Sequence, residues 1–272
     1  MTQLKTNDIL KHNNRLSVQI SLTGHSFLVT SIVTNAVVFF SEILHKSPIS
    51  PEEALHKIKD LIDNNLNVTE NITEVNLIFN NNISTVVPTP LFDETKAVEY
   101  LKFNSKILIT DFIANDSLQA HDIVVVYVPY VNISNYFFET YGSFEYHHTT
   151  TLLLKHVLGS ETFSADLNVH IDVYQNIFTM IITKNGKLIL CNTFDYRTPE
   201  DFIYYILFCF EQNAINPEET PLFLSGYISE EDATYKLLYN YVRTINFTDL
   251  KTKTIFIDGQ PAHRHLLLKS FN

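Results

Sequence analysis

The sequence is poor in glycine, cysteine and basic residues, and it contains no tryptophan. Its 272 residues include six Gly, two Cys, and 19 Lys and Arg against 30 Asp and Glu, a formal charge of -11. The six glycines are scattered singly, so the chain has no GxGxxG or GxxxxGK[ST] loop to cradle phosphates. Without a basic cluster the chain is unsuited to a phosphate backbone, and we expect no nucleic-acid partner. Two cysteines cannot build a disulfide framework, so Cys191 and Cys209 are expected to be core side chains in a reducing compartment.

Long hydrophobic runs are also missing. The longest nearly apolar run covers only residues 202–210, and the first 15 residues have no apolar stretch of the signal-peptide type. The sequence therefore predicts a cytoplasmic protein that does not contact a membrane.

The first half of the chain alternates between strand and helix patterns. Residues 16–22, 27–33 and 37–43 alternate apolar and polar side chains, which predicts a three-stranded meander. Residues 50–62 follow as a helix with a Ser-Pro-Glu-Glu start and an apolar stripe at helical spacing. The further patterns predict strands at 74–79, 84–87, 107–110, 123–128 and 144–148, and helices at 93–103, 131–141 and 149–158.

The same order of elements begins again at residue 168. Strands are predicted at 169–173, 177–183 and 187–194, with an Asn-Gly hairpin turn at 185–186. A helix opens at 198–201, a strand covers 221–225, and a helix starts at 229. The repeated β-β-β-α-β-α order predicts an α/β protein with an internal duplication, its first lobe at 1–160 and its second at 161–272.

Two lobes of this kind resemble the actin-like ATPase superfamily, whose fold is ribonuclease H-like. The segments VVP (86–88), LFD (91–93), YLKF (100–103) and FEYHH (144–148) are similar to a bacterial domain family of unknown function with an actin-like ATPase fold. The resemblance covers nearly the whole chain. It implies a two-lobed actin-like ATPase fold with duplicated β-β-β-α-β-α lobes, but no particular activity.

In that superfamily the hairpin turns of the two lobes face each other and hold the phosphates and the metal of a nucleotide. Carboxylates there position magnesium and water, and glycines let backbone amides approach phosphate oxygens. The resemblance places eight residues around this cleft: Ser21, Thr23, Gly24, His25, Asp172, Tyr174, Ser225 and Gly226. Ser21 stands where the superfamily has an aspartate, Tyr174 replaces a small residue, and Gly226 is the remaining member of a glycine pair.

These replacements predict a degenerate nucleotide site with no catalytic residue, no metal and no cofactor. The resulting hypothesis is a pseudoenzyme that works as a non-catalytic interaction module in the cytoplasm. One alternative is a slow ATPase or ATP-binding protein that uses ATP and magnesium through Asp172. A minor alternative is a ribonuclease H-like metal-dependent nuclease, because Asp172, Asp195 and Asp258 are expected at strand ends, where such a nuclease gathers metal-binding carboxylates.

Two histidine pairs are candidate metal ligands. His147 and His148 are adjacent and point to opposite faces of a strand, so one is expected to be packed and the other to face solvent. His263 and His265 lack a third ligand nearby in the sequence, and we expect them in a solvated C-terminal tail. Neither pair predicts a metal site.

Aromatic residues are the remaining signal. Tyr and Phe are dense at 127–146, where most are expected in the core between the lobes. The helix predicted around 202–208 is apolar on almost all sides, which indicates that it lies between its sheet and another surface. We therefore expect a protein partner of unknown identity, with a second copy of the chain, as a homodimer, among the candidates.

Overall fold

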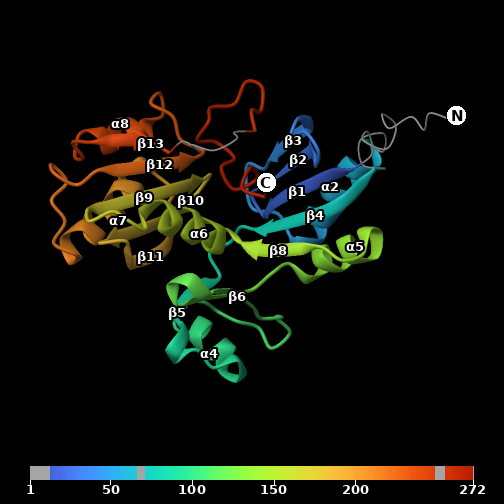
Figure 1. Cartoon of the computed structure of the whole chain (residues 1–272), viewed down its shortest axis with the longest axis horizontal. Coiled ribbons are helices and arrows are strands. Elements are labelled where there is room, and N and C mark those ends of the chain that lie inside the picture. Colours follow the sequence, from blue (N-terminus) through green and yellow to red (C-terminus); the bar gives the residue numbers. More distant parts are fainter. Residues whose placement is uncertain (1–12, 66–70, 249–254, 272) are drawn as a thin grey trace, which may run out of the picture.

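The computed structural model describes residues 13–65, 71–248 and 255–271, and three β-sheets organise this part of the chain (Figure 1). The first sheet consists of β1 (Asn14–Ser21), β2 (Gly24–Ser31), β3 (Val37–Leu44), β4 (Ile72–Phe79) and β8 (Glu145–His148). The second consists of β9 (Leu167–Tyr174), β10 (Ile177–Lys184), β11 (Lys187–Asp195), β12 (Leu222–Gly226) and β13 (Ile245–Phe247).

The two five-stranded sheets have the same strand order. They run β3-β2-β1-β4-β8 and β11-β10-β9-β12-β13, and in each the meander is antiparallel while the later strands are parallel to the first. Both predicted meanders are confirmed. The sequence did not predict β13, whose three residues are too few to show a periodicity. The common order fits the predicted duplication, whose evolutionary origin stays a prediction.

Helices cover the two sheets. The main helices are α2 (Pro51–Asp63), α5 (Val131–Tyr141), α6 (Thr149–Glu161), α7 (Pro199–Gln212) and α8 (Ala233–Tyr239). The two predicted proline starts are confirmed, because α2 and α7 each begin with a complete capping box, on Ser50 and on Thr198. The start predicted at 229 is wrong by four residues. Asp232 accepts a hydrogen bond from the Ser229 amide at 2.7 Å, which closes a turn there before α8 begins.

A small third sheet is inserted between β4 and α5. It consists of β5 (Ser84–Pro88), β7 (Ile123–Tyr127) and β6 (Ala114–Leu118), and α4 (Ala97–Lys102) packs on it (Figure 1). The strand predicted at 107–110 is wrong: Asp111 accepts from the Leu108 amide at 2.8 Å, so this apolar run forms an exposed turn. The helix predicted at 93–103 is split, because the Asp93 side chain caps a separate 3-10 turn, η2 (Glu94–Lys96). Treating residues 80–130 as part of a simple lobe therefore missed a subdomain.

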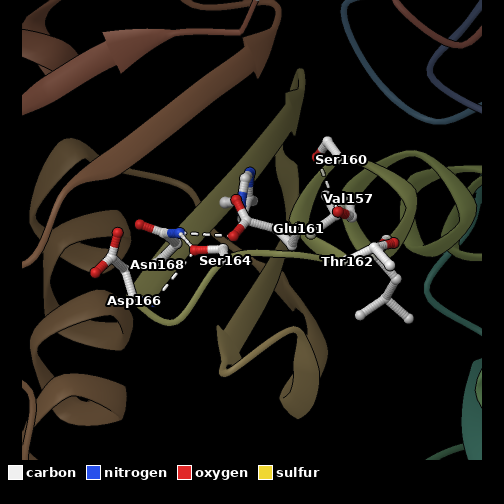
Figure 2. Close-up of polar contacts among 9 residues, drawn as sticks. Val157, Ser160, Glu161, Thr162, Ser164, Asp166 and Asn168 are labelled. Atoms are coloured by element: carbon white, nitrogen blue, oxygen red, sulfur yellow. Dashed lines mark hydrogen bonds and ion pairs between the residues drawn. The ribbon is translucent and has the colours of Figure 1, made fainter.

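Helix α6 connects the first sheet to the second. It follows β8 directly and contacts β10 and β11. Figure 2 shows how its last turn is tied to β9: Asn168 Nδ2 donates to Glu161 Oε2 at 2.7 Å and lies 3.4 Å from Ser164 Oγ. His170 Nε2 lies 3.2 Å from the other oxygen of Glu161. The predicted lobe boundary at 160/161 falls in this last turn and stays a prediction.

The C-terminal segment, residues 255–271, passes between the two larger sheets (red in Figure 1). Its Ile255, Ile257, Leu267 and Leu268 belong to the apolar core of the first sheet, in which Ile181 of β10 also takes part. A separate apolar core lies between the second sheet and helices α7 and α8. The segment thus joins the first core where the two lobes meet. In the described part of the chain, no helix is long and apolar enough to cross a bilayer.

Candidate functional site at the crevice between the lobes

The first hairpin turn packs against its own lobe. Ser21 and Gly24 are paired at the end of β1 and β2, and the Ser21 hydroxyl lies 3.1 Å from that of Thr23. A Cβ on Gly24 would come within 2.8 Å of the Ile43 carbonyl oxygen of β3. Close packing against β3 therefore explains why position 24 is a glycine. The Ser21 hydroxyl is within hydrogen-bond distance of Thr23 inside the turn.

The second hairpin turn touches the first. Gln175 has a positive φ of 51° at the tip between β9 and β10, and its Nε2 donates to the Thr23 carbonyl oxygen at 2.7 Å. The same nitrogen is 3.0 Å from the position of a Cβ on Gly24. The turns that the resemblance assigns to phosphate binding are therefore in direct contact with each other.

Asp172 is bonded inside its own lobe. It lies beside Ser225 in the register of β9 and β12, and the Ser225 hydroxyl donates to its Oδ1 at 2.6 Å. Burial raises the pKa of the Asp172 carboxyl to about 6, and the Ser225 hydrogen bond opposes this shift. Magnesium keeps several water molecules when it binds a protein carboxylate, so this buried and hydrogen-bonded carboxyl group is poorly suited to that role.

Gly226 is held between β9 and the C-terminal segment. Its φ is +85°, and a Cβ there would lie 2.1 Å from the carbonyl oxygen of Val173. Its amide donates to the His263 carbonyl oxygen at 3.0 Å, and the next amide, of Tyr227, donates to Val173 at 2.7 Å. The chain's own C-terminal segment therefore accepts the hydrogen bond from the backbone amide of the one glycine that remains of the expected pair.

Two large side chains fill the space near the turns. His25 is fully buried, and both of its ring nitrogens lack a hydrogen-bond partner among the described residues. Burial, with smaller contributions from His45 and Lys57, lowers the pKa of His25 to about 4. Tyr174 is 2% exposed, and its ring meets that of Tyr227 edge to face at 4.7 Å between centroids. Both residues are packed as neutral core groups.

The predicted solvated tail at His263 and His265 is wrong. Both side chains are buried, at 9% and 3% exposed. The His263 ring stacks on Phe247 at 4.2 Å between centroids and its Nε2 lies 2.9 Å from the Ile228 carbonyl oxygen. Sequence position near a terminus was a poor guide, because the leucines at 266–268 bury this segment between the lobes.

A polar cluster around Glu42 links the lobes through this segment. The Tyr227 hydroxyl donates to Glu42, which belongs to β3 of the first lobe. Arg264 Nη2 lies 3.3 Å and His265 Nε2 3.5 Å from the same carboxylate, and the Arg264 guanidinium is 4.4 Å from the centre of the Tyr227 ring. The Tyr227 hydroxyl is also 3.1 Å from Ser26 Oγ. Glu42 thus connects β2, β3, the turn after β12 and the C-terminal segment.

Little volume remains at this position. One cavity, bordered by Asp172, Tyr174, Gly226 and His265, has a volume of about 10 Å³. A second of about 10 Å³ lies on the other side of Asp172, beside Ser225 and Leu266. Sites for small molecules typically have volumes of roughly 300–1,000 Å³. Each of these cavities has the size of about one water molecule.

The remaining candidate ligands do not converge. Asp195 and Asp258 are exposed, and Asp195 accepts from Asn82 Nδ2 at 2.7 Å at the end of β11. His148 is buried and His147 is one-third exposed, as predicted for neighbours on a strand. Across residues 13–65, 71–248 and 255–271, no three His, Cys, Asp or Glu side chains are grouped to hold a metal ion.

The sequence missed the residues that close the crevice. The eight predicted positions do lie along the two turns and the β9–β12 pair, but Gln175, Glu42 and Arg264 were not among them. No local pattern marks these three, because each acts through a contact with a residue more than 100 positions away. Their roles follow from tertiary packing alone.

Comparisons with known proteins agree with this architecture. A Bacteroides thetaiotaomicron protein with actin-like ATPase fold and unknown function is similar over 90% of this chain and 94% of its own, with a TM-score of 0.77 and 19% identity. The PilM-PilN type IV pilus biogenesis complex contains a chain similar over 86% of this chain and 88% of its own, with a TM-score of 0.53 and 12% identity. A search of curated proteins finds no match.

A family model described as "Protein of unknown function (DUF3822)" matches residues 4–245, most of the chain. At these identities the structural similarities show the fold alone. The resemblance inferred from the sequence and the predicted fold are both confirmed. The chain belongs to the DUF3822 family and has the actin-like ATPase fold.

Proposed function

We propose that this protein is a non-catalytic interaction module, a pseudoenzyme whose inter-lobe crevice is filled by its own chain. The observation that carries the proposal is the C-terminal segment between the lobes, which bonds the Gly226 amide and leaves cavities of about 10 Å³ beside Asp172. A triphosphate would have to displace this segment and break the contact between Gln175 and Thr23. With the crevice filled, the outer surface of the fold is the part available for binding. The ligand that we propose for it is a protein partner in the cytoplasm.

Exposed aromatic side chains on α7 and α8 support the proposal that this protein binds a partner protein. Tyr204 and Phe208 of α7 are 61% and 47% exposed, and Tyr239 of α8 is 63% exposed. Aromatic residues are enriched at protein interfaces because they offer large apolar area with a polar tip. The structurally similar PilM chain was solved in a complex with PilN, which also favours a protein partner. A homodimer stays a prediction that the oligomeric state in solution would test.

The proposal predicts that ATP leaves thermal stability unchanged. Because a ligand that binds only the folded state raises the melting temperature by mass action, millimolar ATP with magnesium should shift it by less than about 1 °C. Differential scanning calorimetry of the full chain with and without the nucleotide measures this. A clear upward shift that Asp172→Ala abolishes would favour the alternative of an ATP-binding protein or slow ATPase, for which the retention of Asp172 is the one supporting feature.

A further inference from the structure

A groove separates the second lobe from the small inserted sheet. Its larger part has a volume of about 830 Å³ and lies between Gly186–Asn192 on one side and Val86, Pro88 and residues 120–123 on the other. Leu158 of α6 also borders this part. This volume is more than eighty times that of either crevice cavity. This groove lies away from the predicted nucleotide site and shares none of its lining residues with the two crevice cavities.

The groove continues along β11. A further part of about 270 Å³ is lined by residues 191–195 of β11 and by Ser84, Thr85 and Val86 of β5. Cys191, Asn192 and Val86 border both parts, so the two form one groove with β11 along its length. The hydrogen bond from Asn82 to Asp195 closes its narrow end. The groove therefore widens from Asp195 toward Lys187.

Both walls of the groove are sheet edges. In the described sheets β11 pairs only with β10 and β5 pairs only with β7. The Tyr196 amide donates to the Asn176 carbonyl oxygen, and antiparallel alternation from this bond directs the backbone N–H and C=O groups of Thr193 and Cys191 away from β10. An edge with free backbone groups is a template for one more strand.

The side chains indicate which strand would fit. The wide end combines polar side chains with an apolar group, in which Ile189 is 50% exposed and Leu190, Val86 and Leu158 also line the groove. Toward the narrow end the walls carry mainly amides and hydroxyls, with the Asp195 carboxylate at the end itself. An extended peptide with apolar residues at alternate positions matches this lining, since it needs both apolar contact and backbone hydrogen bonds.

The charges at the wide end of the groove add a second requirement on the bound segment, namely an acidic residue. Lys184 and Lys187 face each other across the Asn-Gly turn, and neither forms an ion pair with any residue that the structure describes. They form a cationic spot on a chain of formal charge -11. Asp122 borders the opposite wall, so an acidic group would be favoured on the β11 side.

We propose that this groove binds an extended segment of a partner protein, which adds as a strand to the free edge of β11 and places an acidic residue beside Lys187. The proposal rests on the proposed function, because it names the site at which the interaction module takes its partner. Residues 188–193 of β11 span roughly 20 Å, so about six residues of the segment would lie along them, with the ladder interrupted at the β-bulge between Leu188 and Leu190. A small organic molecule in the wide part is the competing occupant.

Selection of peptides on the full chain tests the proposal. A phage-displayed library of random 12-residue peptides is panned on the wild-type protein, and the enriched peptide is synthesised with a fluorophore for anisotropy titration. We expect sequences with alternating apolar residues and an Asp or Glu. Ile189→Arg should weaken binding at least about tenfold, because it places a long charged side chain in the apolar part of the groove.

Two further variants sharpen the test. Lys187→Glu should weaken binding about threefold or more, and exchanging the acid of the peptide for lysine should restore it. The matched control is Val38→Arg, at a 47% exposed position on β3, the corresponding edge strand of the first sheet, and it should change affinity by less than about twofold. Both Ile189 and Lys187 are exposed, so these variants are expected to fold, which circular dichroism checks.

Each outcome decides the proposal. Failure to enrich a peptide, or an enriched peptide that binds Ile189→Arg as well as wild type, overturns the groove assignment, including the case in which only small molecules bind there. Neither result touches the proposed function, which fails only if ATP with magnesium binds the wild-type crevice. Weakened binding by Ile189→Arg and Lys187→Glu, with Val38→Arg unchanged, supports strand addition at β11.

Discussion

Replacing Gly226 by alanine is expected to lower the free energy of unfolding by about 3 kcal/mol or more. The new Cβ would lie 2.1 Å from the Val173 carbonyl oxygen and 2.9 Å from the Val173 amide nitrogen, both in the backbone of β9. Neither atom belongs to a flexible side chain, so β9 and β12 would have to separate. The hydrogen bond from the Gly226 amide to His263 would be disturbed at the same time.

Gly259→Ala is the matched control for this variant. Gly259 has a similar φ of +74°, but no atom lies within 4 Å of its Cβ position. Gly259→Ala should therefore lower the free energy of unfolding only by the cost of a positive φ in the backbone, about 1 kcal/mol. Urea unfolding of both variants measures the difference. Equal losses in the two would show that Gly226 is required for its backbone angle alone and that the close packing of β9 and β12 is incorrect.

The second large effect is loss of stability in mild acid. Burial lowers the pKa of His25, His148 and His170 to about 4, and that of His265 to about 3. The His148 ring is held neutral by geometry as well, because its Nδ1 accepts from the Thr150 amide at 3.2 Å. An unfolded histidine takes up a proton near pH 6.5, and these four remain neutral in the folded state until much lower pH.

The sign of the effect follows from proton binding. Between pH 6.5 and about 4 the unfolded chain binds more protons than the folded one, so stability falls as the pH is lowered through this window. Asp172 acts in the opposite direction, because its pKa is raised to about 6 and protonation favours the folded state. Each histidine contributes a loss of roughly 2 kcal/mol at pH 5, and Asp172 offsets about 1 of the total.

Unfolding by urea at pH 7, 6 and 5 measures this loss, which we expect to reach on the order of 7 kcal/mol. His25→Leu should reduce the pH dependence by about one quarter, because it removes one of four similar contributions. His56→Leu, at a side chain that is 76% exposed, should leave it unchanged. A stability that is flat from pH 7 to 5 would show that these histidines are not buried as neutral groups.

The sequence was a good guide wherever local periodicity sets the structure. The two meanders, the capping boxes at Ser50 and Thr198 and the Asn-Gly hairpin at 185–186 all depend on neighbouring residues, and all are confirmed. The run at 107–110 is largely apolar, but the Leu108 amide donates a hydrogen bond to the Asp111 carboxylate, and this closes an exposed turn. Apolar composition alone could not distinguish that turn from a strand.

The predicted cleft residues lie near one another, but the way in which the crevice is closed could not be predicted. The contact of Gln175 with Thr23 joins residues far apart in the sequence. The burial of His263 and His265 depends on where the last 17 described residues pack, between two separately formed sheets. The groove along β11 requires the position of an inserted sheet that the sequence did not separate from the first lobe.

Hydrogen exchange at the crevice, with and without ATP and magnesium, tests the central claim most directly. If the C-terminal segment fills the crevice, the hydrogen-bonded amides of Gly226, Lys269 and Ser270 should exchange at least about a hundredfold more slowly than in an unfolded chain. Adding the nucleotide should change nothing there or at the turns 21–25 and 172–175. Rapid exchange of these three amides, together with new protection of both turns when ATP is added, would contradict the account.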